Sequence, residues 1–123
     1  MTNTMDMAGT KVLALAIDGP PIATEADGND IISEAFSTEA ELIAIPVERL
    51  SPDFLRLETR IAGTVFQKFV NYHLRCAIIG DIAPLLENSK ALSDFVRETN
   101  KGRSIWFLAS LDDLRAKLTR VGA

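Results

Sequence analysis

Residues 59–80 read TRIAGTVFQKFVNYHLRCAIIG, and this stretch decides the fold class. From Thr59 to Tyr72 apolar side chains recur at helical spacing while polar side chains occupy the opposite face, as in an amphipathic helix. The run from Arg75 to Ile79 that follows is short and apolar, and Gly80 ends it, as expected of a buried strand. The stretch therefore predicts a helix that leads into a strand, the repeating unit of α/β proteins.

The same alternation extends to both sides of this stretch. Further strands are predicted at Lys11 to Asp18, Leu42 to Val47 and Ser104 to Ala109. Helical patterns separate them: one begins at Asp27 or Asn29, one runs from Ser89 to Asn100, and the last has Leu111, Leu114, Leu118 and Val121 on one side. Strands joined by helices of this length pair in parallel through right-handed crossovers. We therefore predict a small α/β layer fold, a mostly parallel sheet of four or five strands with helices on both faces.

The pattern is weaker at two places. Residues 1–10 are polar and without periodicity, which predicts a flexible N-terminal segment before a single domain over residues 11–123. Residues 81–88, which contain Pro84, are predicted to form a loop.

Composition excludes several classes of protein. With 47% hydrophobic and 24% charged residues the chain of 123 residues has an ordinary globular composition. Its longest apolar run, Val12 to Ile17, is far shorter than the ~18 residues of a membrane span, and no secretory signal is visible. We therefore expect no membrane partner. The single cysteine, Cys76, allows no intramolecular disulfide, so we expect a reducing, cytoplasmic location.

Charge is unevenly distributed along the chain. Residues 1–58 hold eleven acids and three bases, whereas residues 59–123 hold six acids and ten bases. Such asymmetry either steers a charged partner or marks two opposite solvated faces of one domain. The net charge of -4 argues against nucleic acid as a partner.

Motifs for cofactors, metals and nucleophilic catalysis are absent from the sequence. There is no glycine-rich phosphate loop, no zinc spacing and no calcium-loop pattern, so no cofactor and no metal are predicted. Cys76 opens an apolar run, which favours a core cysteine over a catalytic pair with His73, the only histidine.

Several runs resemble a bacterial family of unknown function, the one numbered 4180. They lie at residues 54–63, 67–72, 77–81, 92–95 and 98–102, and the resemblance spans about residues 11–119. It implies membership of that family and no particular activity.

The order of elements is similar, more distantly, to STAS domains, the fold of anti-sigma-factor antagonists. In those domains a serine at the start of the helix after the second long strand is phosphorylated. The matching stretch here runs from Glu58 to Gly63 and lacks the Asp-Ser-Ser-Gly of the phosphorylated members. Arg60 falls near the position of the modified serine, and Thr59 is the only hydroxyl available there.

Two candidate sites follow from these patterns. The first is the rim at the carboxyl ends of the strands, where Asp18 and Asp81 could share a ligand and the helix start at Thr59 could take an anion. The alternative is that Asp81 caps a turn and Thr59 caps a helix, neither of which needs a ligand.

The second candidate is the polar face of the helix over residues 59–72, which carries Arg60, Gln67, Lys68 and Asn71. Gly63 lies inside this helix at a cost of about 0.5–1 kcal/mol relative to Ala, which predicts close approach of another backbone. That backbone is either an internal strand or a second subunit.

We therefore predict a non-catalytic regulatory or interaction module that binds a protein partner or a second copy of itself. The alternative is a small-molecule or anion-binding protein, or a minor enzyme, that uses the rim around Asp18 and Asp81. The shape of the rim distinguishes the two hypotheses: a concave pocket would favour ligand binding or catalysis, and a filled turn would favour the interaction module.

Overall fold

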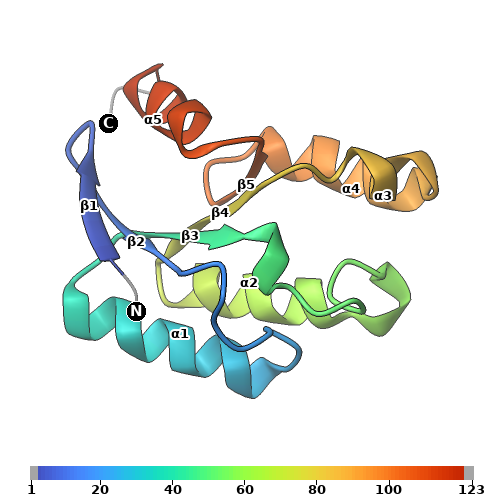
Figure 1. The fold of residues 1–123 in the computed structure, drawn as a ribbon, viewed down its shortest axis with the longest axis horizontal. Coiled ribbons are helices and arrows are strands. Elements are labelled where there is room, and N and C mark those ends of the chain that lie inside the picture. The colour runs from blue at the N-terminus through green and yellow to red at the C-terminus, as the bar shows by residue number, and fades with distance from the viewer. Residues whose placement is uncertain (1–2, 121–123) are drawn as a thin grey trace.

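From the second strand onward, strands are separated by helices along the part of the chain that the computed structural model describes, residues 3–120 (Figure 1). The strands are β1 (Asn3–Met7), β2 (Thr10–Ala14), β3 (Leu42–Pro46), β4 (Arg75–Ile79) and β5 (Ile105–Leu108). The helices are α1 (Glu25–Thr38), α2 (Ile61–Asn71), α3 (Ala83–Glu87), α4 (Lys90–Asn100) and α5 (Leu111–Arg120), with short 3-10 turns η1 (Val47–Arg49) and η2 (Leu57–Thr59). The predicted α/β class is confirmed. Val121 and residues 1–2 of the predicted flexible segment lie outside the described residues.

The five strands form one sheet in the order of the chain, β1-β2-β3-β4-β5. Strands β2 to β5 are parallel, with Ala44 opposite both Ala14 and Ala77 and with Ala77 opposite Trp106. The four predicted strands are therefore adjacent and parallel, as expected. Only β1 runs antiparallel to its neighbour β2.

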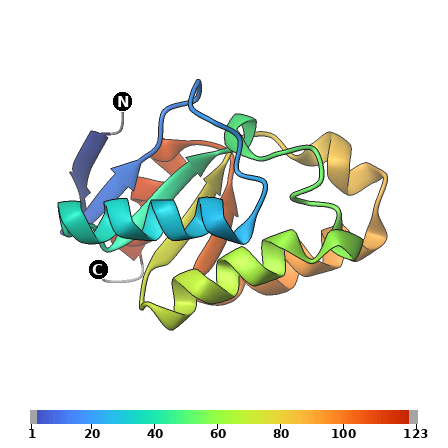
Figure 2. The same ribbon diagram turned by 90° about the horizontal axis from the view of Figure 1, so that it is seen from below.

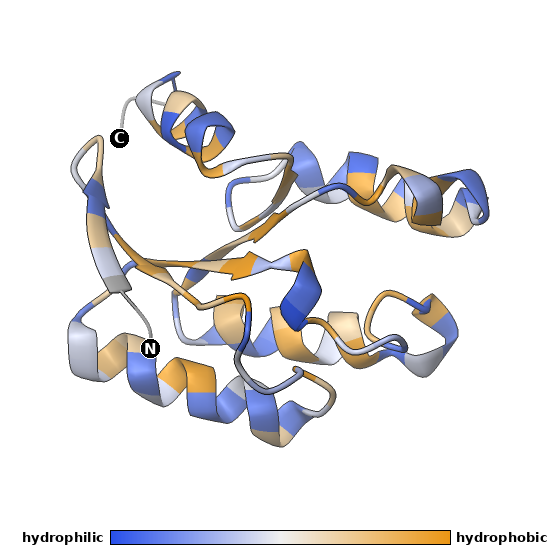
Figure 3. Ribbon diagram, viewed as in Figure 1, coloured by the Kyte–Doolittle hydropathy of each residue, from blue (hydrophilic) through white to orange (hydrophobic). Residues whose placement is uncertain are grey.

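Helices cover both faces of the sheet: α1, α2 and α4 pack on one face and α5 packs on the other (Figures 1 and 2). Crossovers between parallel strands are right-handed as a rule. Because β2 to β5 follow one another across the sheet in chain order, the helices that connect them, α1, α2 and α4, lie on the same face. Their core includes the packed rings of Phe66, Phe95 and Phe107. Helix α5 packs Leu114 and Leu118 on the other face, in the core of Trp106. Figure 3 shows mostly hydrophobic strands between helices with one hydrophobic and one polar side.

Strand β1 corrects the prediction of a flexible segment over residues 1–10. Asn3–Met7 pair with β2 through a tight turn at Ala8 and Gly9, both of which have positive φ. Two consecutive positive φ values match the twist of a two-residue hairpin turn. Met7, only 1% exposed, anchors the hairpin in the core on the α5 side.

Strand β2 is shorter than the predicted Lys11–Asp18. The Leu15 N–H still donates to the Ala44 carbonyl, 3.0 Å away, but beyond it the chain leaves the sheet and Ile17 is 62% exposed. The Arg49 guanidinium binds the segment that follows β2. Its Nη1 donates to the Ala16 carbonyl at 2.8 Å, and its Nε donates to the Pro20 carbonyl at 2.7 Å. A buried side chain from another segment thus decides where the strand ends.

Residues 81–88 are more regular than the predicted loop, because Ala83–Glu87 form the short helix α3. Pro84 lies in its first turn, where a missing N–H costs nothing.

Helix α2 begins at Ile61, two residues after the predicted start, because Arg60 has a left-handed φ of 62°.

Candidate binding surfaces

The outer side of α2 borders a shallow, open groove toward α4, which we call the Gly63 groove. Its lining residues are Leu57, Arg60, Gly63, Thr64, Gln67, Lys68 and Phe95. Three of the predicted site residues, Arg60, Gln67 and Lys68, therefore line one surface. Helical spacing explains this for Gln67 and Lys68, because residues three and four apart on a helix are neighbours, whereas Arg60 lies just before the helix.

Three polar side chains of this face have partners within the chain. Gln67 Nε2 donates to Asn71 Oδ1 at 2.9 Å, which places Asn71 beside the groove. Lys68 Nζ forms an ion pair with Glu25 Oε2 of α1 at 3.0 Å, and the two side chains are 29% and 52% exposed. Such a pair contributes little to stability, so Lys68 can exchange it for another carboxylate.

Gly63 is open to its surroundings. Among residues 3–120, no heavy atom outside its own helix backbone and chain neighbours lies within 4 Å of the point where a Cβ would stand. Of the two expected reasons for this glycine, the internal strand is therefore excluded. The second, approach by a second subunit, remains a prediction.

Thr59 belongs to the turn before α2. Its hydroxyl donates to the Arg56 and Asp53 carbonyls, at 2.7 and 3.0 Å, and accepts the Ile61 N–H at 3.3 Å. These bonds stabilise η2 and account for Thr59 without a ligand. The N-cap of α2 is Arg60, whose side chain makes no capping bond, so Thr59 is not the helix cap that the alternative expected.

The two rim aspartates are placed differently from one another. Asp81 Oδ1 accepts the N–H of Ala83 at 2.9 Å, so this carboxylate closes the turn before α3. Asp18 lies exposed in the segment after β2, beside Ile17. Among the contacts described for residues 3–120, none joins Asp18 to Asp81. The predicted turn-capping role is the one that this geometry shows for Asp81.

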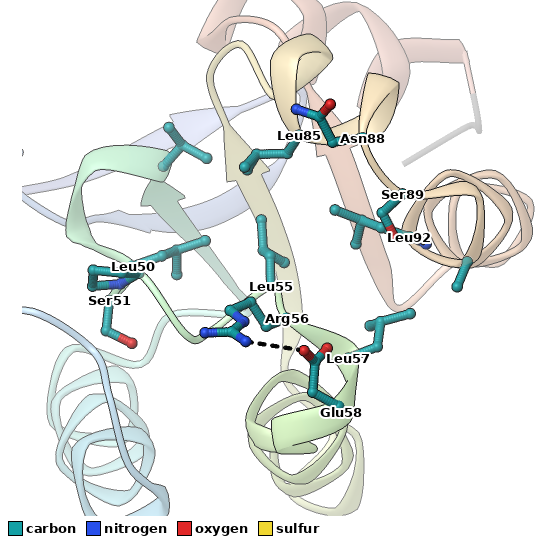
Figure 4. Close-up of a pocket in the computed structure, with 13 residues that line it drawn as sticks. Leu50, Ser51, Leu55, Arg56, Leu57, Glu58, Leu85, Asn88, Ser89 and Leu92 are labelled. Carbon is teal, nitrogen blue, oxygen red and sulfur yellow. Dashed lines mark hydrogen bonds and ion pairs between the residues drawn. The ribbon is translucent and has the colours of Figure 1, made fainter.

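A cavity of about 500 Å³ lies between the chain after β3 and the segment of α3 and α4, and no motif in the sequence pointed to it. Its wall includes five leucines, Leu50, Leu55, Leu57, Leu85 and Leu92, and we call it the leucine pocket. Figure 4 shows Leu55, Leu85 and Leu92 converging on it from the chain before η2, from α3 and from α4.

The charged side chains at the leucine pocket neutralise one another. Arg56 Nη2 lies 3.2 Å from Glu58 Oε2, and Arg56 Nη1 lies 3.3 Å from Asp53 Oδ1. Hydrogen bonds from its own backbone N–H and from Arg56 hold the pKa of the Glu58 carboxyl below its usual value. The carboxylate of Glu58 and then that of Asp53 raise the pKa of Arg56. Arg56 is therefore already paired with both carboxylates.

Cys76 and His73 do not form a reactive pair. Cys76 is fully buried in β4, and burial raises the pKa of its thiol far above the ordinary value. His73 is exposed, with a left-handed φ of 61°. The core assignment of Cys76 is therefore confirmed.

A comparison with family models identifies the chain. A model described as Domain of unknown function (DUF4180) matches residues 7–118. The chain belongs to this family. No curated protein and no solved structure matches this DUF4180 chain. The likeness to STAS domains stays a prediction.

Over residues 3–120 no group of three or more His, Cys, Asp or Glu side chains is placed to hold a metal ion. Within the same part of the chain, no helix has the length and apolar character needed to cross a membrane.

Proposed function

We propose that this DUF4180 protein is a non-catalytic interaction module whose partner docks in the Gly63 groove. The observation that carries the proposal is the open position of Gly63 within α2. A glycine there costs about 0.5–1 kcal/mol relative to alanine, and no neighbour within residues 3–120 requires it. A partner backbone that approaches α2 closely accounts for it.

The side chains around Gly63 indicate the chemistry of the partner. Leu57 and Phe95 give the groove an apolar part, while Arg60 and Lys68 bring positive charge to its edge. Complementary charge favours a partner segment with acidic residues beside apolar ones. A regulatory role would follow if docking blocks or orients that partner.

The alternative of a carboxylate enzyme at the rim finds less support. Asp81 is engaged in its own turn, and its carboxylate makes no described contact with Asp18. A pair of acids that divides acid and base roles needs both within reach of one reacting group.

The test places a photo-crosslinking amino acid at Thr64 in the native host and identifies what it captures. The captured protein is then purified and its affinity measured for Gly63→Leu and for the double variant Arg60→Ala, Lys68→Ala. We expect each to weaken binding at least tenfold. Ala116→Leu, a similar enlargement on the exposed side of α5, should bind like the wild type.

Three results would overturn the proposal. They are the lack of any crosslinked protein, unchanged affinity in Gly63→Leu, and equal loss in Ala116→Leu. A crosslink to a second copy of the chain would support it only if Gly63→Leu also abolishes the dimer in sedimentation.

A further inference from the structure

The leucine pocket has the size and shape of a small-molecule site. About 500 Å³ lies within the roughly 300–1,000 Å³ of typical ligand pockets. Leu55 and Leu92 form a buried part of its wall, whereas Leu85 is 48% exposed on α3. An exposed leucine at the mouth of an apolar cavity gains burial when the cavity is filled, which favours occupancy.

The charges of the pocket indicate what it excludes. Its only charged lining residues are Arg56 and Glu58, and they are bonded to each other, with Asp53 as a second partner of Arg56. An anion would have to displace Glu58 from Arg56, and a cation would have to displace Arg56 from Glu58. An uncharged ligand leaves this network intact.

Two uncharged polar side chains lie at the α4 end of the pocket. Ser89 Oγ accepts the Leu92 N–H at 3.1 Å, which leaves the hydroxyl hydrogen able to donate. Asn88 Nδ2 donates to the Pro84 carbonyl at 3.1 Å. A carbonyl or ether oxygen on the ligand would find a donor in the Ser89 hydroxyl.

From these observations we infer that the leucine pocket binds an uncharged, mostly apolar small molecule that carries one hydrogen-bond acceptor. This inference is independent of the interaction proposed at the Gly63 groove. The two surfaces share only the Leu57 side chain.

The experiment titrates the full chain with N-phenyl-1-naphthylamine, a neutral probe that fluoresces in apolar surroundings. We expect saturable one-to-one binding. An uncharged aromatic ester that offers a carbonyl oxygen should displace the probe competitively. The anionic probe 8-anilinonaphthalene-1-sulfonate should bind at least tenfold more weakly.

Two pairs of variants place the binding in the leucine pocket. Ala91→Phe fills the cavity from α4, and its control Ala116→Phe adds the same ring to the exposed side of α5. Leu85→Ser removes an exposed leucine from the mouth, and its control Leu111→Ser removes one that is 36% exposed elsewhere. Affinity for the neutral probe should fall at least tenfold in Ala91→Phe and Leu85→Ser only, with circular dichroism and melting temperature close to those of the controls.

Several outcomes would overturn the inference. They are no saturable binding of the neutral probe, equal binding of the anionic one, no displacement by the ester, and unchanged affinity in both pocket variants. If the chain self-associates and Leu85→Ser abolishes that association, the pocket belongs to an interface between two copies and the small-molecule assignment fails.

Discussion

The side-chain amide of Asn100 pairs with the backbone of Phe107 in both directions. Asn100 Oδ1 accepts the Phe107 N–H at 2.6 Å, and Asn100 Nδ2 donates to the Phe107 carbonyl at 3.3 Å. Strand β5 pairs with β4 on one side and lies at the edge of the sheet. The last residue of α4 thus takes the place of a neighbouring strand, one way in which proteins cover an edge that would otherwise pair with another chain.

We predict that Asn100→Ala lowers the free energy of unfolding by about 1–3 kcal/mol, because a backbone donor and acceptor lose their partners. The variant should also aggregate faster through the uncovered edge of β5. Chemical denaturation and light scattering measure the two effects. Asn71→Ala, which removes an exposed asparagine near the end of α2, serves as the control and should stay within about 0.5 kcal/mol. Equal stability of the two variants would contradict this prediction.

Arg49 joins two loops at the carboxyl ends of the strands, so its loss should be costly. Its guanidinium, with the residue only 9% exposed, donates to the carbonyls of Ala16 and Pro20. We predict that Arg49→Met destabilises the fold by about 1–3 kcal/mol, because two acceptors lose their partner.

A Cβ at Gly19 would stand 2.4 Å from Arg49 Cζ, so Gly19→Ala must displace the guanidinium and break the same bonds. The double variant should therefore cost no more than Arg49→Met alone. Urea unfolding of the four proteins gives the coupling energy. Additive losses would show that the two residues act independently.

The general fold could be predicted from sequence because periodicity is local information. The apolar run of β4 and the stripe of α2 are visible within a few residues, and the pairing of parallel strands follows from connection lengths. The sequence also identified Gly63 as unusual, but its surroundings needed the structure. Strand β1 was missed because its pairing depends on a turn at Ala8 and Gly9 that carries no strong signal.

The features near the leucine pocket depend on contacts between distant residues. Arg49 is bonded to residues 29 and 33 positions away in the sequence, and an arginine in an irregular stretch looks solvent-exposed. Leu55 and Leu85, typical core residues in the sequence, become the wall of a cavity only because the chain after β3 and helix α3 lie opposite each other. The polar residues of α2 were placed correctly on one face, since helical spacing fixes that without tertiary contacts.

The contribution of Asp27 to the free energy of unfolding should depend on pH, and the lowered pKa of its carboxyl gives the direction of that dependence. Its Oδ2 accepts the N–H of Ala23 at 2.8 Å and of Thr24 at 3.0 Å, and Thr24 Oγ1 accepts the Asp27 N–H in return. The bond from Ala23 contributes most to lowering the pKa of Asp27 from its ordinary value of 3.8. A lowered folded-state pKa means that the stabilisation is complete above the unfolded value and is lost as the pH falls through the folded value.

Asp27→Ala should accordingly cost about 1 kcal/mol at pH 7, and the difference from the wild type should shrink below about pH 4. Urea unfolding at pH 7, 4 and 3 measures it. Asp30→Ala, on the exposed side of α1, is the control and should show a smaller loss at pH 7. A deficit for Asp27→Ala that does not change with pH would mean that the aspartate acts through packing rather than through its charge.

The thiol of Cys76 should be nearly inert in the folded protein. It lies on β4, an inner strand of the sheet, at 0% exposure, and burial raises its pKa far above the usual value. Since the thiolate is the reactive form, a raised pKa keeps the group unreactive across the neutral range, and labelling requires the strand to open. We expect a disulfide reagent at neutral pH to label the native protein at least a hundredfold more slowly than the protein in denaturant. Ala116→Cys, in an exposed position on α5, supplies a matched thiol that should react at the rate of a free cysteine. Rapid labelling of Cys76 in the native wild type would show that β4 is accessible and would reopen a chemical role for this residue.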